Sequence, residues 1–181
     1  MDAGAGWRTH CWRAARAQLL PHLPVEVVRL RVRRAAELGL DYKTYAGVRA
    51  TTGRDLVAFL FSSNALGLVA PPPVMPAGRT AKLAAIRDCG RIALAQAPLT
   101  PDGLWHLLPG FDACYAAPGP FATDRQARAA LRAALGDIPS DMVLLIGDAP
   151  WERDWCATAR LAGYLPADRF FAPASLHSGS A

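Results

Sequence analysis

Short apolar runs alternate with longer segments of helical periodicity from residue 54 onward, and this alternation most constrains the fold. The apolar runs are DLVAFLFSS (55–63), RIALAQA (91–97), FDACYAA (111–117) and DMVLLIGD (141–148), with a last short strand expected near 169–171. Nearly continuous apolar strands joined by helices indicate a parallel sheet that is covered on both faces. We therefore expect an α/β fold: a doubly wound, mainly parallel sheet of about five strands.

The connecting segments carry helix start and stop signals. We expect helices over 80–90, 100–110, 123–136 and 150–163. Thr80 and Thr123 are the expected N-caps of the first and third, because a threonine oxygen accepts a hydrogen bond from a free N–H of the first turn. The sequence PPPVMP (71–76) predicts a rigid linker.

A helical segment is expected to precede this domain. We expect helices over 7–20, 25–38 and 41–51, the last capped by Asp41. In the second helix Val28, Val32, Ala35 and Ala36 are predicted to line the buried face, with Arg29, Arg33 and Arg34 on the other. The predicted organisation is a helical N-terminal segment (1–53), a Rossmann-like α/β domain (54–173) and a flexible tail (174–181).

The positive charge lies in the N-terminal segment. Of the 20 basic and 15 acidic residues, nine and four fall in residues 1–50, and eleven of each fall in residues 51–181. A local excess of this kind can attract nucleic acid or an acidic membrane surface, and the outline around Arg31, Arg33, Arg34 and Lys43 resembles a helix-turn-helix. The alternatives are a solvated helix face and a helical cap or docking surface packed on the sheet.

Other features of the composition exclude several classes of protein. The four cysteines form no CxxC pair, so neither a zinc site nor a disulfide framework is indicated. No secretory signal and no apolar stretch of membrane-spanning length is visible, so we expect a cytoplasmic protein without a membrane span. Basic residues are almost all arginine, which is typical of a GC-rich, bacterial genome.

Polar residues follow several of the predicted strands. Ligands of open α/β sheets bind outside the carboxyl ends of the strands. The candidate ligand-binding residues are therefore Ser62, Ser63, Asn64, Gln96 and Asp148, with Glu152 just beyond the last of them.

The segment LLIGDAPWERDWCATARLAGY resembles the last core motif of the haloacid dehalogenase-like superfamily. The resemblance covers about residues 54–171 and implies that Asp148 and Glu152 help to hold a magnesium ion, with Asp154 as a nearby alternative to Glu152. It aligns Ser62 with the nucleophilic aspartate of the first motif and Asn64 with the acid–base aspartate. Gln96 is nearest to the second motif, and Arg125 would supply the basic residue of the third.

Both first-motif carboxylates are therefore replaced. A phosphoaspartyl mechanism needs a carboxylate nucleophile and a metal that screens charge, whereas a serine hydroxyl without an adjacent base is a weak nucleophile. The expected function is a non-enzymatic or residual-activity binding or regulatory module, with a protein partner or a small anionic ligand. The alternatives are a metal-dependent phosphatase or phosphotransferase that uses Asp148 and Glu152, and a nucleic-acid-binding protein.

Structural roles remain open for the same residues. Asp148 can act only as a helix N-cap, with Glu152 favourable in the first turn. Ser62 and Asn64 can simply end a strand and begin a turn. Trp151 and Trp155, four residues apart, fit a core or an interface better than a binding platform.

Overall fold

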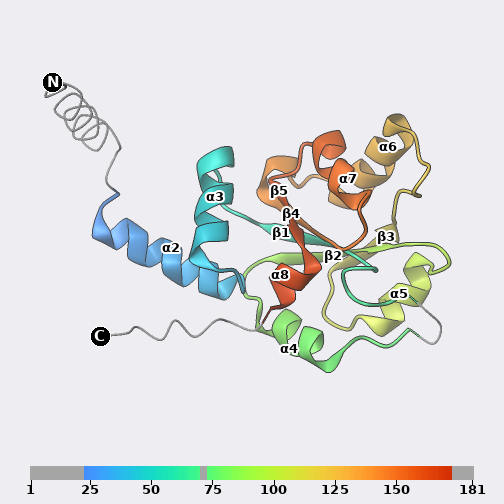
Figure 1. Ribbon diagram of the computed structural model, residues 1–181, viewed down its shortest axis with the longest axis horizontal. Helices are drawn as coiled ribbons and strands as arrows, with labels where there is room; N and C mark the ends of the chain where they lie inside the picture. Colours follow the sequence, from blue (N-terminus) through green and yellow to red (C-terminus); the bar gives the residue numbers. More distant parts are fainter. Residues whose placement is uncertain (1–22, 70–72, 173–181) are drawn as a thin grey trace, which may run out of the picture.

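The computed structural model describes residues 23–69 and 73–172. Within these residues one sheet of five parallel strands has the order β3-β2-β1-β4-β5 (Figure 1). The strands are β1 (Ala58–Ser62), β2 (Gly90–Ala95), β3 (Ala113–Ala116), β4 (Val143–Gly147) and β5 (Gly163–Pro166). The predicted doubly wound, parallel α/β fold is confirmed.

Helices connect the strands and precede the sheet. They are α2 (Val25–Glu37), α3 (Tyr42–Thr52), α4 (Ala77–Ala85), α5 (Pro101–Leu107), α6 (Asp124–Leu135), α7 (Glu152–Ala159) and α8 (Ala167–Phe171), with a 3-10 turn at Ser140–Met142. None of the described helices combines the length and the apolarity needed to cross a bilayer. The helix predicted over 7–20 and the tail predicted over 174–181 lie outside the described residues, as does part of the predicted linker.

The strands bury both of their faces, which is why their sequences are almost uniformly apolar. On β1, Phe59 and Phe61 face a cluster formed with α4, α5 and α8, whereas Ala58 and Leu60 face a second cluster formed with α6 and α7. Figure 1 shows α4, α5 and α8 on one side of the sheet and α6 and α7 on the other. The helices thus cover the sheet as two layers.

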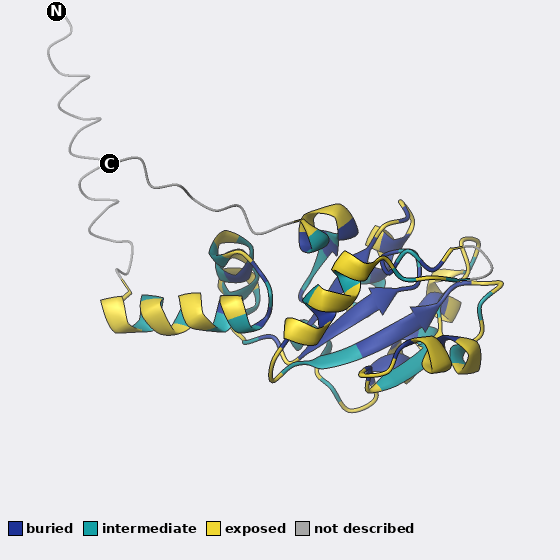
Figure 2. Ribbon diagram, turned by 90° about the horizontal axis from the view of Figure 1, so that it is seen from below, coloured by how far each residue is buried: buried dark blue, intermediate teal, exposed yellow. Residues whose placement is uncertain are grey.

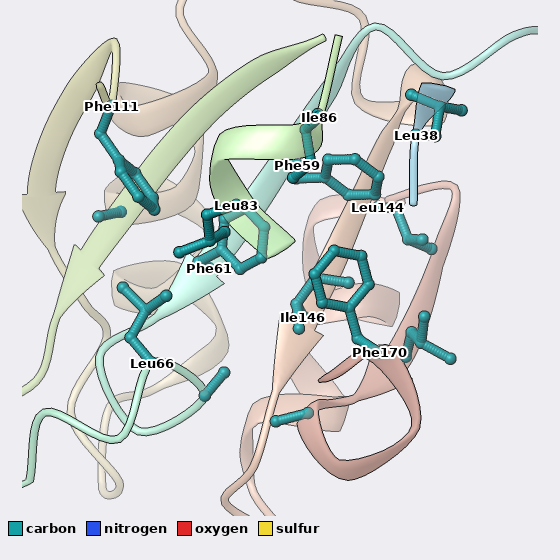
Figure 3. Close-up of a cluster of buried hydrophobic side chains, with 14 of the residues drawn as sticks. Leu38, Phe59, Phe61, Leu66, Leu83, Ile86, Phe111, Leu144, Ile146 and Phe170 are labelled. Carbon is teal, nitrogen blue, oxygen red and sulfur yellow. The ribbon is translucent and has the colours of Figure 1, made fainter. Parts of the chain in front are cut away.

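Aromatic rings fill the centre of the larger cluster (Figure 3). Phe170 of α8 packs edge-on against Phe61, with ring centroids 5.6 Å apart. The ring centroid of Phe59 lies 5.5 Å from that of Phe170. Phe111 contacts Phe61 from the other side at 5.6 Å. Such edge-to-face contacts add to the free energy gained by burial, so the last described helix is held firmly against the central strand.

The N-terminal segment joins the core only at its second half. Ala35, Leu38, Leu40 and Tyr45 belong to the same buried cluster as the sheet. The predicted buried face of α2 is wrong in part, because Val32 is 47% exposed and Ala36 is also exposed. Among the described residues, only the last turn of α2 reaches the buried cluster of the sheet, and most residues of its earlier turns are exposed (Figure 2).

Arg34 was expected on the solvent side of α2 and is instead largely buried. Its guanidinium donates to Asp55 at 3.1 Å and to the backbone carbonyls of Leu56 and Asp88 at 3.1 and 3.0 Å. Burial alone would lower the pKa of Arg34, but the charge of Asp55 and the hydrogen bond to it raise that pKa above its ordinary value. Arg34 therefore ties α2 to the loops at the amino edge of the sheet.

Two other local predictions differ from the structure. The strand expected near 169–171 is wrong, because β5 lies at Gly163–Pro166 and Phe170 and Phe171 belong to α8. Thr80 does not cap α4, which begins three residues earlier, directly after Pro76. By contrast, Asp41 accepts a hydrogen bond from the Thr44 N–H, and Thr123 forms a capping box with Gln126, so both predicted caps are confirmed.

Candidate functional site

The predicted site lies where the winding of the sheet reverses direction. Strands β1 and β4 are neighbours, and from them the chain proceeds outward to β2 and β3 on one side and to β5 on the other. Ser62 ends β1, and Asp148 directly follows β4. This switch point is the usual ligand site of doubly wound sheets, which makes it the first place to look for function.

The carboxylate of Glu152 occupies the centre of this site. Its Oε2 accepts hydrogen bonds from Ser62 Oγ at 2.9 Å and from the backbone N–H groups of Asp148 and Ala149 at 2.7 and 3.1 Å. Its Oε1 accepts a hydrogen bond from Asn64 Nδ2 at 2.9 Å. Glu152 has no exposed surface. We call Ser62, Asn64, Glu152 and the two backbone amides the Glu152 cluster.

The local chain explains how Glu152 reaches this position. Glu152 is the first residue of α7, so its side chain turns back over the N–H groups that precede the helix. Gly147 leaves the space that the carboxylate uses: a Cβ there would lie 2.8 Å from Glu152 Oε2 and 2.5 Å from Tyr164 Cε2. The glycine is therefore required by close packing.

Tyr164 borders the Glu152 cluster from β5. Burial, followed by the negative charge of Glu152, raises the pKa of the Tyr164 hydroxyl. The guanidinium of Arg153 lies 5.0 Å from the centre of the same ring, in a cation–π contact. Glu152 is thus enclosed on the β5 side by an aromatic ring.

Ser62 is fully buried, and its hydroxyl both donates and accepts a hydrogen bond. It donates to Glu152 and accepts a hydrogen bond from the Ala65 N–H at 3.0 Å. The carboxylate beside it is chemically a general base, which the sequence did not reveal. A substrate nonetheless has no approach to a hydroxyl that is fully enclosed, so this arrangement suits a structural bond better than a nucleophile.

Ser63 and Gln96, also predicted to bind a ligand, do not join the Glu152 cluster. Ser63 Oγ accepts a hydrogen bond from the Gln96 N–H at 3.1 Å. The Gln96 side chain donates to the Pro118 carbonyl at 3.4 Å and is 8% exposed. Both side chains satisfy backbone groups between neighbouring strands, and their predicted ligand role stays untested.

The residues at the switch point do not fit a magnesium ion in this arrangement. A carboxylate offers about four lone-pair positions, and Glu152 already accepts four hydrogen bonds. A cation there would face N–H and O–H donors. Asp148 is exposed, and no group of three His, Cys, Asp or Glu residues gathers anywhere in residues 23–69 and 73–172. The predicted Asp148–Glu152 metal site stays a prediction.

The remaining predicted residues lie apart from the switch point. Arg125, in the first turn of α6, is exposed. Of the predicted nucleic-acid residues, Arg34 is committed to Asp55 and Arg33 pairs with Glu37 at 3.1 Å. Lys43 is exposed and Arg31 partly exposed.

Sequence reasoning missed that Glu152 binds Ser62 and Asn64. The spacing of four residues between Asp148 and Glu152 was the available signal, because it places the second carboxylate in the first turn of a helix that starts at the strand end. Trp155 is buried, as expected for a core residue, whereas Trp151 precedes α7 and is 39% exposed.

No protein-family model matches the chain, and comparison with curated proteins and with solved structures yields no significant match. The resemblance to the haloacid dehalogenase-like superfamily therefore stays a prediction from the sequence.

Proposed function

We propose that this chain is a binding module derived from a haloacid dehalogenase-like fold, and that its strand-end site no longer transfers phosphoryl groups. The buried Glu152 carboxylate, which accepts four hydrogen bonds, carries this proposal. In the resembled family the corresponding carboxylates face a metal and a substrate, whereas Glu152 faces four hydrogen-bond donors inside the molecule. Ser62 and Asn64, which replace the aspartates of the first motif, supply two of these donors.

The replacement is chemically coherent. If positions 62 and 64 carried aspartates, as in the resembled first motif, their carboxylates and that of Glu152 would repel one another without a metal. A serine, an asparagine and one carboxylate instead satisfy each other, and no cation is needed. The site then holds the ends of β1 and β4 together, which is a structural role.

Turnover and metal binding test this part of the proposal. The purified chain should not hydrolyse p-nitrophenyl phosphate with or without magnesium, and calorimetry should detect no magnesium binding at millimolar concentration, in either the wild type or Asp148→Asn. Magnesium-dependent turnover that Asp148→Asn abolishes would overturn it and would establish the metal-dependent phosphatase alternative.

The binding surface that we propose is α2 with the groove beside it. Val25 and Leu30 are 65% and 66% exposed, and Val32 is 47% exposed. Figure 2 shows α2 extending away from the sheet with most of its surface exposed. A helix of this length is marginal without packing, so these apolar side chains are best explained by a partner that covers them.

The groove between α2 and α3 has a volume of about 450 Å³ and a mixed lining. Val27, Leu30 and Tyr45 provide apolar contacts. The charged residues that line it are Arg31, Arg33, Arg34, Arg49, Glu37 and Asp55. Glu37 and Asp55 both pair with arginines of the same set, which leaves the groove with a positive excess.

These properties fit an acidic amphipathic helix of a partner protein. Residues 1–22 of this chain carry three arginines and one aspartate, so their charge does not complement the groove. A second copy would place arginines against arginines. Nucleic acid would neutralise the arginines but would leave Val25 and Leu30 uncovered.

Peptide binding tests the surface. A helical peptide of glutamate and leucine should bind the full chain, and its lysine–leucine counterpart should not. Leu30→Ser should weaken binding by about tenfold or more, whereas Leu107→Ser, at another exposed leucine on α5, should not. Absence of binding would overturn the proposal. Tight binding of duplex DNA that falls steeply with salt and ignores Leu30→Ser would instead establish the nucleic-acid alternative.

A further inference from the structure

A second groove lies between the carboxyl-terminal ends of α6 and α7, which pack side by side (Figure 1). The loop that leads into β4 closes it, so it lies toward the amino edge of the sheet, away from the Glu152 cluster. Its volume is about 500 Å³, which is within the range of small-molecule sites.

Three arginines line this groove: Arg128 and Arg132 from α6 and Arg160 from the end of α7. No acidic residue occurs among the described residues that line it. Each of the two helix C-termini contributes about half a negative charge, together about one, against three guanidinium groups. The groove therefore keeps an excess of about two positive charges, more than is needed to balance the helix ends.

Arg128 is held in place by the neighbouring helix. Its Nε donates to the Thr158 carbonyl at 3.2 Å, across the groove from α6 to α7. Side chains that are fixed before a ligand arrives lose less conformational entropy on binding. The salt bridges of the described residues include none of the three arginines.

Arg160 has a backbone conformation that arginine rarely adopts. It ends α7 with φ 54° and ψ 47°, in the left-handed region. Glycine is the common residue at this position because it has no Cβ to clash. The arginine is therefore strained, and residues that keep such strain are concentrated at functional sites.

We infer that this groove binds a compact, multiply charged oxyanion of the phosphate class, either free or as the phosphoryl group of a small metabolite. Arginine's planar fork suits phosphate oxygens. The excess of about two charges matches a dianion. The groove is distinct from the α2 surface, so its occupation is independent of the proposed partner protein.

The strain at Arg160 makes a sharp test available. Arg160→Gly removes the guanidinium and relieves the left-handed backbone, so the urea midpoint of unfolding should stay constant or rise. Pyrophosphate titrated into the full chain by calorimetry should bind to the wild type. Arg160→Gly and Arg132→Gln should each weaken that binding by about tenfold or more.

Arg153→Gln is the matched control, because Arg153 is an exposed arginine of α7 that does not line the groove. It should bind pyrophosphate as the wild type does. The inference is overturned if the wild type does not bind pyrophosphate, or if Arg153→Gln weakens binding as much as Arg160→Gly, which would show diffuse attraction to a basic surface. Preferential binding of a long acidic peptide or of DNA over pyrophosphate would overturn the small-ligand assignment.

Discussion

The hydroxyl of Ser62 donates a hydrogen bond to Glu152 Oε2 at 2.9 Å, although 90 positions separate the two residues in the sequence. This bond joins the end of β1 to the start of the helix after β4, at the switch point of the sheet. Ser62 and Glu152, both candidate site residues from the sequence, are thus hydrogen-bonded to each other in the buried Glu152 cluster.

Removal of the Glu152 carboxylate should lower the stability of the fold. In Glu152→Ala the N–H groups of Asp148 and Ala149 lose their buried acceptor, and Asn64 loses its partner. We expect the free energy of unfolding in urea to fall by about 3 kcal/mol or more. Glu152→Gln keeps one acceptor oxygen and should cost only about half as much. Equal stability of Glu152→Ala and the wild type would contradict a stabilising role of the Glu152 cluster.

Gly147 should not tolerate a methyl group. Gly147→Ala places a Cβ 2.8 Å from Glu152 Oε2 and 2.5 Å from Tyr164 Cε2, so side chains must move. We expect the free energy of unfolding to fall by about 2 kcal/mol, with a lower melting temperature. Gly78→Ala, in α4 with no atom within 4 Å of the new Cβ, is the control. It should be neutral or stabilising, because alanine is the better helix former.

Introducing two carboxylates at the site tests the proposed descent from a haloacid dehalogenase-like fold. Ser62→Asp combined with Asn64→Asp replaces two hydrogen-bond donors of Glu152 by negative charges. We expect a lower melting temperature without metal, because like charges in a buried site repel. Added magnesium should raise it again, whereas sodium at equal ionic strength should not. A melting temperature indifferent to magnesium would contradict the proposed descent from a metal-binding site.

Arg34 should be more important for folding than for binding. Its guanidinium donates to Asp55 and to the Leu56 and Asp88 carbonyls, so Arg34→Ala removes one hydrogen-bond donor from each of these three groups. We expect a loss of about 2 kcal/mol by urea unfolding, with Arg34→Lys failing to recover it fully. Arg29→Ala on the same helix, whose pair with Glu26 is exposed, should change stability little. A similar loss in both variants would contradict the assignment.

Cys89 should react slowly with alkylating agents. Burial, which outweighs the nearby charge of Arg34, raises the pKa of its thiol to about 12. Only the thiolate reacts, so at pH 8 labelling of Cys89 by iodoacetamide should be far slower in the folded chain than in urea. The rate should rise about tenfold for each pH unit up to pH 10. Because the folded-state pKa is raised, the associated stability is complete at neutral pH and is lost as the pH rises toward 12.

Peptide mass spectrometry identifies the labelled cysteine. Similar labelling rates for Cys89 in the folded and the unfolded chain would show that the thiol is not shielded.

The elements that the sequence predicted well are those with strong local signals. Uniformly apolar strands such as VLLIG and the capping box at Thr123 are determined by neighbours in the chain. The segment after β4 was less predictable: Phe170 and Phe171 suggested a strand, but Phe170 reaches the core from a helix because Phe59 and Phe61 of the sheet lie beneath it. That contact connects residues more than a hundred positions apart, beyond the reach of local pattern.

By itself, the sequence determined the class of fold and the edge of the sheet where Ser62, Asn64 and Asp148 gather. Only the tertiary structure decided that Glu152 turns inward to accept four hydrogen bonds, that Arg34 is largely buried while Val32 is exposed, and that three arginines from two helices line one groove. The physical reason is the same in each case. Periodicity fixes which residues share a face of one element, but burial and pairing depend on which other element packs against that face.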